Sequence, residues 1–266
     1  MIKKLNRITF LIGCTVFLLF SCKESEPIQI TPANFHTSID KVVEVMIHDI
    51  FSPPVASRVF AYPNIAAYEI IAQQDVSYTS LKNQVKGLKS IPKADASKKV
   101  NYPLAAVIAH LHLSKKLIFS EQKIEVYQDS LYKSWEAKNA LEFNDSKEYG
   151  LQVAQFIATW MHADNYAQTR TMPKFSVNAE DEARWQPTPP SYMDGLEPHW
   201  NKIRPFVLDS AAQFKPIPPP KFSMDKKSDF YKELKEVYDE EKGEVVAKRR
   251  RKTSRRRDDW QDDMDF

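Results

Sequence analysis

Proline is concentrated in one segment of this 266-residue chain, and that segment limits the fold more than any other feature. Ten of the 17 prolines lie between residues 165 and 225. Proline lacks a backbone N–H and has a fixed φ, so this segment cannot form a regular helix or the interior of a strand. It nevertheless carries aromatic residues that a disordered linker usually lacks, among them Trp185, Tyr192, Trp200, Phe206, Phe214 and Phe222. We therefore expect an ordered loop whose aromatic side chains are anchored in grooves between helices.

The rest of the chain shows helical rather than strand periodicity. Apolar residues recur at three- and four-residue spacing, and no stretch alternates convincingly at period two. Pro63 should kink or interrupt its helix, and Asp145 with Glu148 matches a capping box. A lysine-rich connector at 79–101 should be an exposed loop. The expected helices are 38–51, 55–74, 104–118, 120–138, 145–162 and 229–240. The third is apolar on more than one face and should be central, so the sequence predicts a mainly α fold.

The first 21 residues have the pattern of an export signal. A short basic stretch precedes an almost uninterrupted apolar run, 8–20, which is too short to span a membrane comfortably. The run ends in Leu-Phe-Ser-Cys22, which resembles a bacterial lipobox and predicts lipid attachment at Cys22. An ordinary signal peptide with a chance cysteine is the alternative. A lipid anchor would place the protein in the bacterial cell envelope, with the outer membrane favoured, and residues 22–37 would serve as a tether.

Basic residues are concentrated at the two ends of the chain. The formal net charge is +3, but the signal contributes +3 and residues 243–266 contribute +2, so residues 22–242 carry −2. A nearly neutral body gives no electrostatic basis for binding nucleic acid. The membrane, reached through the N-terminal lipid, is the partner that the sequence indicates, and no particular protein partner is predicted.

The last 24 residues differ in composition from everything before them. Eight of the ten residues at 248–257 are basic. Like charges repel and this stretch has almost nothing to bury, so we expect residues 243–266 to be disordered. A purine-rich message read one base out of register yields such arginine and lysine runs, which favours a frameshifted or truncated coding sequence. A genuine basic tail that binds anionic lipid is the alternative.

Motifs for several common chemistries are absent from the sequence. His-Glu-x-x-His, Gly-x-Ser-x-Gly and Gly-x-Gly-x-x-Gly do not occur, so zinc-protease, esterase and nucleotide-loop readings have no support. His110 and His112 are about 200° apart around a helix and cannot bind one metal ion from one face. Asp49 beside His48 is expected at a helix end rather than in a catalytic pair. We therefore predict no metal site.

Two stretches together resemble a known family. Residues 51–69 read FSPPVASRVFAYPNIAAYE, and residues 185–200 contain Trp-Gln-Pro-Thr-Pro-Pro followed by Glu-Pro-His-Trp. A further proline- and aromatic-rich run comes after them. In this order they resemble bacterial vanadium-dependent haloperoxidases and their phosphatidic acid phosphatase type 2 relatives, specifically lipoprotein members. The resemblance implies that residues 38–242 are the N-terminal helical region of such an enzyme.

The resemblance also implies a site that this chain does not carry. The family binds vanadate or phosphate through Lys-x₆-Arg-Pro, Ser-Gly-His and Ser-Arg-x₅-His, because guanidinium groups donate paired hydrogen bonds to oxyanions. None of the three motifs occurs here, and Glu197 stands seven residues before the single Arg-Pro pair, at Arg204. We therefore expect no catalytic residue and no bound cofactor. The fold should be an incomplete helical bundle with a long proline- and aromatic-rich ordered loop.

The proline-rich segment supplies the residues that the resemblance would place at the pocket rim or in its scaffold. They are Arg170, Trp185, Pro189, Tyr192 and Trp200. Ordinary core packing is the alternative role for each. Two functions remain open: an envelope protein resembling part of a haloperoxidase or phosphatase and inactive alone, or a non-enzymatic helical lipoprotein that binds a partner or ligand. Phosphatases and haloperoxidases share one oxyanion pocket, so the sequence does not choose a substrate.

Overall fold

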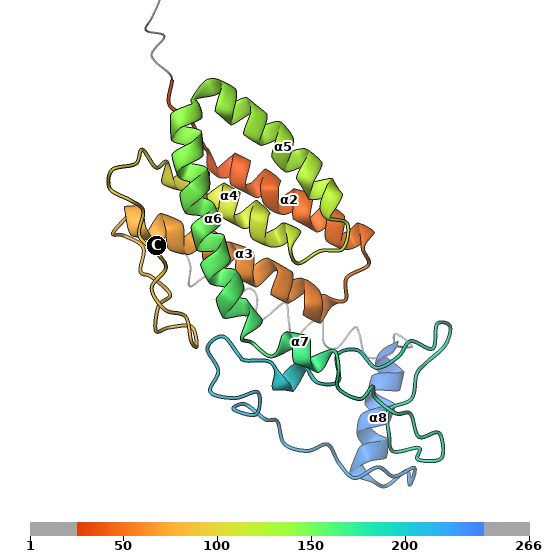
Figure 1. Cartoon of the computed structure of the whole chain (residues 1–266). Helices are drawn as coiled ribbons and strands as arrows, with labels where there is room; N and C mark the ends of the chain where they lie inside the picture. Colours follow the sequence, from red (N-terminus) through yellow and green to blue (C-terminus); the bar gives the residue numbers. More distant parts are fainter. Residues whose placement is uncertain (1–25, 242–266) are drawn as a thin grey trace, which may run out of the picture. The chain divides into compact units, whose positions relative to one another are not determined.

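The computed structural model describes residues 26–241 (Figure 1). The predicted signal peptide, the lipid site at Cys22 and the basic tail at 243–266 lie outside these residues. The described residues divide into two compact units. The first unit comprises residues 26–175 and 195–211, and the second comprises residues 176–194 and 212–241.

Helices account for the regular structure of both units. The described residues contain no strand, so the predicted mainly α fold is confirmed. The second unit has one helix, α8 (Asp229–Glu241). The helices of the first unit are α2 (Pro32–His48), α3 (Pro53–Gln74), α4 (Tyr102–Lys115), α5 (Glu121–Lys138), α6 (Ala140–His162), α7 (Tyr166–Thr169) and the 3₁₀ helix η1 (Trp200–Lys202). Within residues 26–241 no helix is long and apolar enough to cross a membrane.

Helix α4 is the centre of the first unit, as its apolar sequence predicts. It packs against α2, α3, α5 and α6 (Figure 1). One side of α4 contributes Ala105, Ala109 and neighbours to a buried cluster with α3 and α6. The other side contributes Leu104 and Leu111 to a second cluster with α2 and α5. Burial of apolar surface on both sides makes this helix the main hydrophobic element of the unit.

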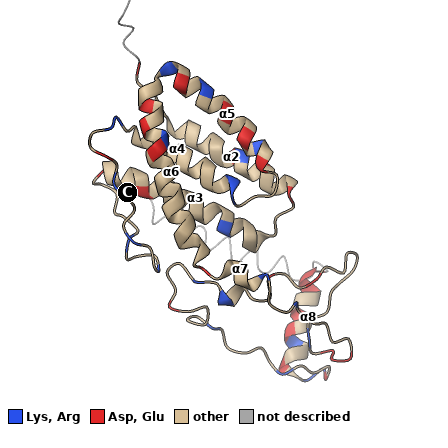
Figure 2. Cartoon of the chain, in the orientation of Figure 1, with Lys and Arg blue, Asp and Glu red and all other residues tan. Residues whose placement is uncertain are grey.

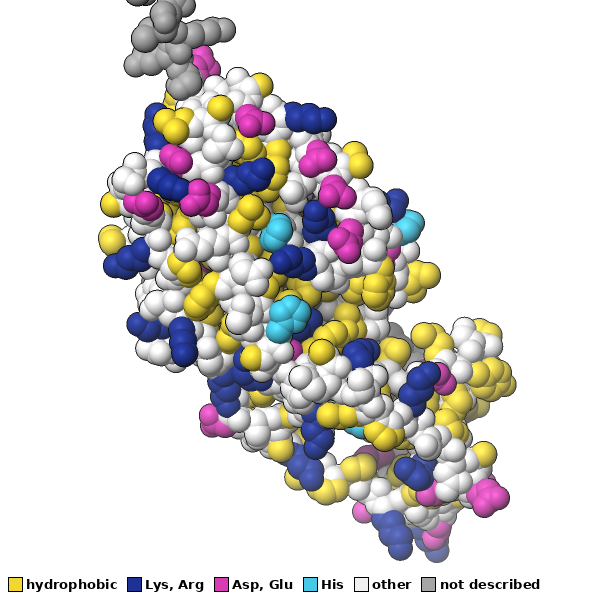
Figure 3. All heavy atoms as spheres, in the orientation of Figure 1, with side chains coloured by type: hydrophobic (Ala, Val, Ile, Leu, Met, Phe, Trp, Pro, Cys, Tyr) yellow, Lys and Arg dark blue, Asp and Glu magenta, His cyan; other side chains and the backbone are white. Residues whose placement is uncertain are grey.

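Charged residues of the first unit are rare on the central helix α4. Figure 2 shows acidic and basic residues along α5, while α4 is almost free of them. On the face seen in Figure 3, the charged side chains of the helices lie among apolar ones. A helix that buries one stripe and exposes the rest has this pattern.

Four helices begin earlier than predicted, α3 and α4 by two residues each and α2 and α6 by more. Helix α2 starts at Pro32 rather than at residue 38, because proline suits a first turn and the Asn34 side chain accepts a hydrogen bond from the Thr31 N–H (2.8 Å). Residues 26–31 are not a loose tether either, since Ile28 is buried and its N–H donates to Glu142 (2.8 Å). The predicted tether at residues 22–37 was therefore wrong for residues 26–37.

Helix α6 starts at Ala140, and the predicted capping box at Asp145 was wrong. The Asn139 side chain caps the helix instead by accepting from the Glu142 N–H. The Asp145 carboxylate accepts from the Lys99 N–H of the preceding connector (2.8 Å). A polar residue inside a helix can thus resemble a cap when its partner lies on another segment.

Helix α3 continues through Pro63, so the predicted interruption does not occur. The next residue, Asn64, donates its side-chain amide to the Phe60 carbonyl (2.8 Å) and supplies a donor beside the proline. The connector before α4 also differs from its prediction. Its apolar residues Val85, Leu88 and Ile91 are buried against α3 and α6, so it is a packed loop rather than an exposed one.

The proline-rich segment is ordered but divided between the units. In the first unit, Phe206 packs edge-on against the Tyr62 ring, with 5.3 Å between centroids, as the anchoring prediction requires. In the second unit, Phe222 packs against Phe230 of α8 at 5.1 Å. Tyr192 and Phe214 are largely exposed, so anchoring in helix grooves was wrong for these two.

Candidate functional site

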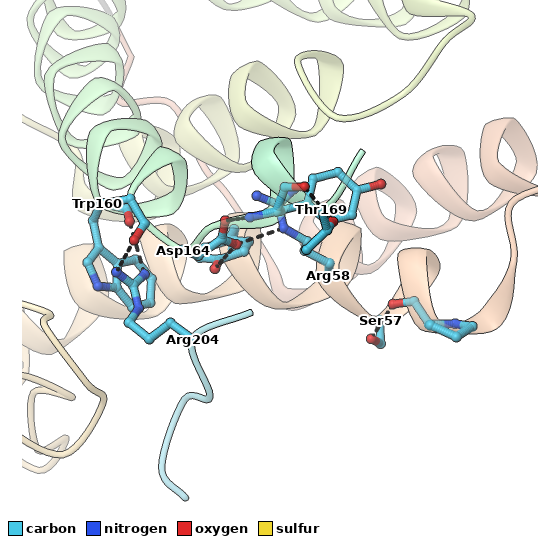
Figure 4. Close-up of polar contacts among 10 residues, drawn as sticks. Ser57, Arg58, Trp160, Asp164, Thr169 and Arg204 are labelled. Atoms are coloured by element: carbon cyan, nitrogen blue, oxygen red, sulfur yellow. Dashed lines mark hydrogen bonds and ion pairs between the residues drawn. The ribbon is translucent and has the colours of Figure 1, made fainter. Parts of the chain in front are cut away.

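A buried ion pair joins the start of α3 to the end of α6. Arg58 lies in the second turn of α3, and Asp164 follows the last residue of α6 by two positions. The Arg58 Nε donates to the Asp164 Oδ2 (2.9 Å), and the two side chains are 9% and 1% exposed. Figure 4 shows these side chains pointing toward each other. A charge pair this far from water must be supported by further hydrogen bonds.

Both oxygens of the Asp164 carboxylate have such support. Tyr62, one helical turn after Arg58, donates its hydroxyl to Oδ2 (2.6 Å), and the Tyr166 N–H donates to Oδ1 (2.8 Å). Burial raises the pKa of Asp164, but the hydrogen bonds from Arg58, Tyr62 and the Tyr166 N–H outweigh it and hold that pKa below its ordinary value. Burial and the bond to Asp164 raise the pKa of the Tyr62 hydroxyl. At neutral pH Asp164 is therefore an ionised carboxylate and Tyr62 is a neutral phenol.

The guanidinium of Arg58 packs against two aromatic rings. Its central carbon lies 4.1 Å from the centroid of the Tyr166 ring and 5.0 Å from that of Tyr62. Such contacts stabilise a cation that has little water around it. Only Nε makes a hydrogen bond within the described residues, which leaves the two terminal nitrogens of Arg58 without one.

A second arginine fastens residues 195–211 to the end of α6. Arg204 donates to the carbonyls of Trp160 (2.9 Å) and Ala163 (3.4 Å), and its guanidinium lies over the Trp160 ring at 4.7 Å. These carbonyls are the negative end of the helix dipole, which favours a cation there. Among the described residues no carboxylate pairs with Arg204.

The two arginines line one cavity of about 640 Å³. Asp164 is the third charged residue in its wall, and the rest is mostly apolar, including Ile203, Phe206 and Leu208. A second cavity, of about 550 Å³, lies beside Phe35 and Tyr68 and has no charged side chain in its wall. The first cavity is therefore the candidate functional site.

The residues of this cavity do not match the vanadate-binding motifs of the family that the sequence resembles. No histidine and no lysine lies in its wall, and a carboxylate, Asp164, does. A multiply charged oxyanion needs several cations without competing negative charge. In the described part of the chain, no three His, Cys, Asp or Glu side chains are grouped so that they could hold a metal ion.

Two of the histidines considered in the sequence, His110 and His48, lie away from the cavity wall. His110 is buried against the Phe35 ring, and burial lowers its pKa to about 4. His48 and Asp49 do lie at a helix end: Asp49 accepts from the N–H groups of Phe119 (3.0 Å) and Ser120 (2.9 Å). This contact ties the end of α2 to the start of α5.

The structure brings together two of the five residues predicted at the pocket rim. Trp200 lines the cavity and packs edge-on against Tyr166, with 6.3 Å between centroids. Arg170 forms an ion pair with Glu197, and its guanidinium also lies over the Tyr166 ring, 4.5 Å from the ring centroid.

The other three lie in the second unit. Trp185 and Tyr192 are 50% and 61% exposed, and Pro189 precedes a cis peptide bond to Pro190. Their predicted role at a pocket rim stays a prediction.

Sequence reasoning missed the cluster of Arg58, Tyr62, Asp164 and Arg204. Arg58 and Asp164 are 106 residues apart, so no local spacing joins them. One signal was available: arginine occurs only five times before residue 248, whereas lysine is common. An arginine in the apolar pattern of a helix indicates a site where its planar fork is needed.

Comparison with known proteins relates this fold to one class of enzyme. No family model matches the sequence, and no curated protein matches it. Among solved structures, the chain is similar to a vanadium-dependent haloperoxidase, so the predicted relation is confirmed. That structure is described as the first bacterial vanadium-dependent iodoperoxidase; the identity is 67% and the TM-score 0.79. The match covers 81% of this chain and 52% of the iodoperoxidase, so this chain spans about half of its relative.

Proposed function

We propose that the chain is a lipid-anchored envelope protein that forms the N-terminal helical part of a haloperoxidase- or acid phosphatase-like enzyme and is inactive alone. One observation carries the proposal. The chain is 67% identical to the iodoperoxidase over 52% of that protein, yet lacks all three vanadate- or phosphate-binding motifs. Iodide oxidation is a property of the relative, and here it is an expectation for the intact enzyme only.

The charges at the candidate site support the absence of catalysis. Catalysis on a vanadate or phosphate group needs preorganised cations aimed at the oxyanion. Here one arginine is matched by Asp164 and the other by carbonyls at the end of α6. This arrangement stabilises the helical unit and leaves one net positive charge in the cavity wall, which is too little for a multiply charged anion.

The test is an activity assay on the full chain in detergent. Iodide and bromide oxidation are measured with hydrogen peroxide and added vanadate, and phosphatase activity is measured without vanadate. The intact bacterial iodoperoxidase serves as the positive control. We expect rates equal to those of buffer with vanadate, and turnover above this level by the 266-residue chain would contradict the proposal.

The lipid anchor has its own test. Cys22→Ser should abolish incorporation of labelled fatty acid and move the protein from the membrane fraction to the soluble fraction, because the acyl chains supply the attachment. Cys14→Ser, within the same signal, is the matched control and should leave both readouts unchanged. Membrane association that survives Cys22→Ser would argue against lipidation.

A second function, ligand binding without catalysis, is favoured by the cavity beside Arg58. The coding sequence downstream of residue 266 separates the two. A frame there that encodes Lys-x₆-Arg-Pro, Ser-Gly-His and Ser-Arg-x₅-His supports the enzyme, and its absence supports the ligand-binding protein.

A further inference from the structure

We propose that the cavity beside the Arg58–Asp164 pair binds a small organic monocarboxylate with an apolar body. The site lies within the first unit, and the proposal depends on its geometry rather than on the proposed function. It applies whether or not the chain takes part in halide oxidation.

The terminal donors of Arg58 are available to a ligand in the cavity. A guanidinium has five N–H donors, and within the described residues only the Nε donor of Arg58 has an acceptor, on Asp164. The side chain is nonetheless 9% exposed and lines the cavity. Water in the cavity can reach the four remaining donors, and the oxygen atoms of a ligand can replace that water.

The geometry of these donors suits a carboxylate. The Tyr166 ring, 4.1 Å from the guanidinium carbon, and the bond from Nε to Asp164 fix the plane of the group. Its Nη1–Nη2 edge then presents two parallel N–H donors, which match the two oxygens of a carboxylate. Because the plane is already fixed, little side-chain entropy is lost on binding.

The charge of the wall favours a single negative charge. Its charged residues are Arg58, Asp164 and Arg204, so the wall carries one net positive charge. One carboxylate neutralises that charge. A phosphate dianion would leave an excess negative charge next to Asp164, whose carboxylate is ionised.

The remaining wall favours an apolar body. Ile203, Phe206 and Leu208 line the cavity, and its volume of about 640 Å³ is typical of sites for small molecules. Inorganic anions and acetate would leave this apolar surface in contact with water. A short-chain fatty acid such as hexanoate has both required parts.

The experiment is a calorimetric titration of the full chain in detergent with hexanoate. Tryptophan fluorescence is recorded in parallel because Trp200 lines the cavity. We expect saturable binding of hexanoate and at least about tenfold weaker binding of 1-hexanol, acetate and hexyl phosphate. Hexanol lacks the anion, acetate lacks the apolar body, and hexyl phosphate tests the other oxyanion. Absence of hexanoate binding, equal binding of hexanol, or tighter binding of hexyl phosphate would each overturn the proposal.

Variants locate the binding. Arg58→Lys keeps the charge but loses the planar fork, and should weaken hexanoate binding at least about tenfold. Arg184→Lys, at an exposed position in the second unit, is the matched control and should bind as the parent does. Leu208→Glu leaves the Arg58–Asp164 pair intact and places a negative charge in the cavity wall, so it should abolish binding even if Arg58→Lys fails to fold. Unchanged affinity in the Leu208→Glu protein would place the ligand elsewhere and refute the assignment.

Discussion

In the first unit, α4 is surrounded by four helices and buries most of its side chains, whereas α8 of the second unit buries none. The second unit relies on contacts such as the Phe222–Phe230 pair and leaves Phe214 and Ile217 largely exposed. Apolar burial is the main stabilising term in folding, so stability should be concentrated in the first unit. The candidate site lies there too, where a rigid core can hold a polar cluster in place.

Truncation of a core aromatic residue should have the largest effect. Phe143 of α6 is 1% exposed and packs against Tyr132, with 5.2 Å between ring centroids. Phe143→Ala should lower the free energy of unfolding by about 4 kcal/mol, because it leaves a cavity in the core. Chemical denaturation followed by circular dichroism measures this. A loss below about 1 kcal/mol would mean that the first unit is not the stable part.

Breaking the buried Arg58–Asp164 ion pair should have the second largest effect on stability. Asp164→Asn removes the charge that balances Arg58, and should cost about 3 kcal/mol at neutral pH. The pKa of Asp164 is lower in the folded state, so its contribution is present above its ordinary pKa and is lost as pH falls through the folded value. The variant should therefore lose less stability than the parent on acidification below about pH 4. Equal acid sensitivity of both proteins would rule out this role.

A smaller effect is expected at the junction of α2 and α5. Burial raises the pKa of Asp49, but hydrogen bonds from Ser120, His48 and the Phe119 N–H outweigh it and lower that pKa to about 2. Asp49→Asn should cost about 1 kcal/mol, because the amide keeps an acceptor oxygen but loses the charge that strengthens these hydrogen bonds. Urea titrations at pH 7 and pH 3 should show the cost at pH 7 and a smaller one at pH 3, since the parent loses this contribution between its ordinary pKa and about 2. A cost that grows toward acid would contradict the assignment.

The smallest effect should come from the second unit. Phe222→Ala removes one aromatic pair from a unit with little buried surface, and should lower the free energy of unfolding by about 0.5 kcal/mol. It is the direct counterpart of Phe143→Ala and is measured in the same way. Comparable losses in the two variants would mean that both units share one cooperative core.

The sequence predicted the helices wherever local pattern decides them. The burial of α4, the span of α5 and the start of α8 at Asp229 follow from apolar periodicity and helix-start residues. The start of α6 could not be read in this way, because Asp145 resembles a cap but bonds to Lys99 on another segment.

The candidate site was beyond such reasoning for a similar reason. Arg58, Asp164 and Arg204 come from three segments that meet only through the packing of α3 on α6 and the contact of Arg204 with the end of α6. The relation to haloperoxidases was accessible because proline and tryptophan elements recur in a fixed order, independently of contacts. Arg58, Tyr62 and Trp200 lie within those elements, but the order of the elements does not show that these residues meet at one cavity.

Binding of vanadate to the full chain tests the central claim most directly. In ⁵¹V nuclear magnetic resonance, free vanadate gives a narrow signal that protein binding broadens and shifts. The account predicts that one equivalent of the chain leaves this signal unchanged, while the intact iodoperoxidase abolishes it. Stoichiometric broadening by the chain alone would show that it holds the oxyanion without the three motifs, and would contradict the account.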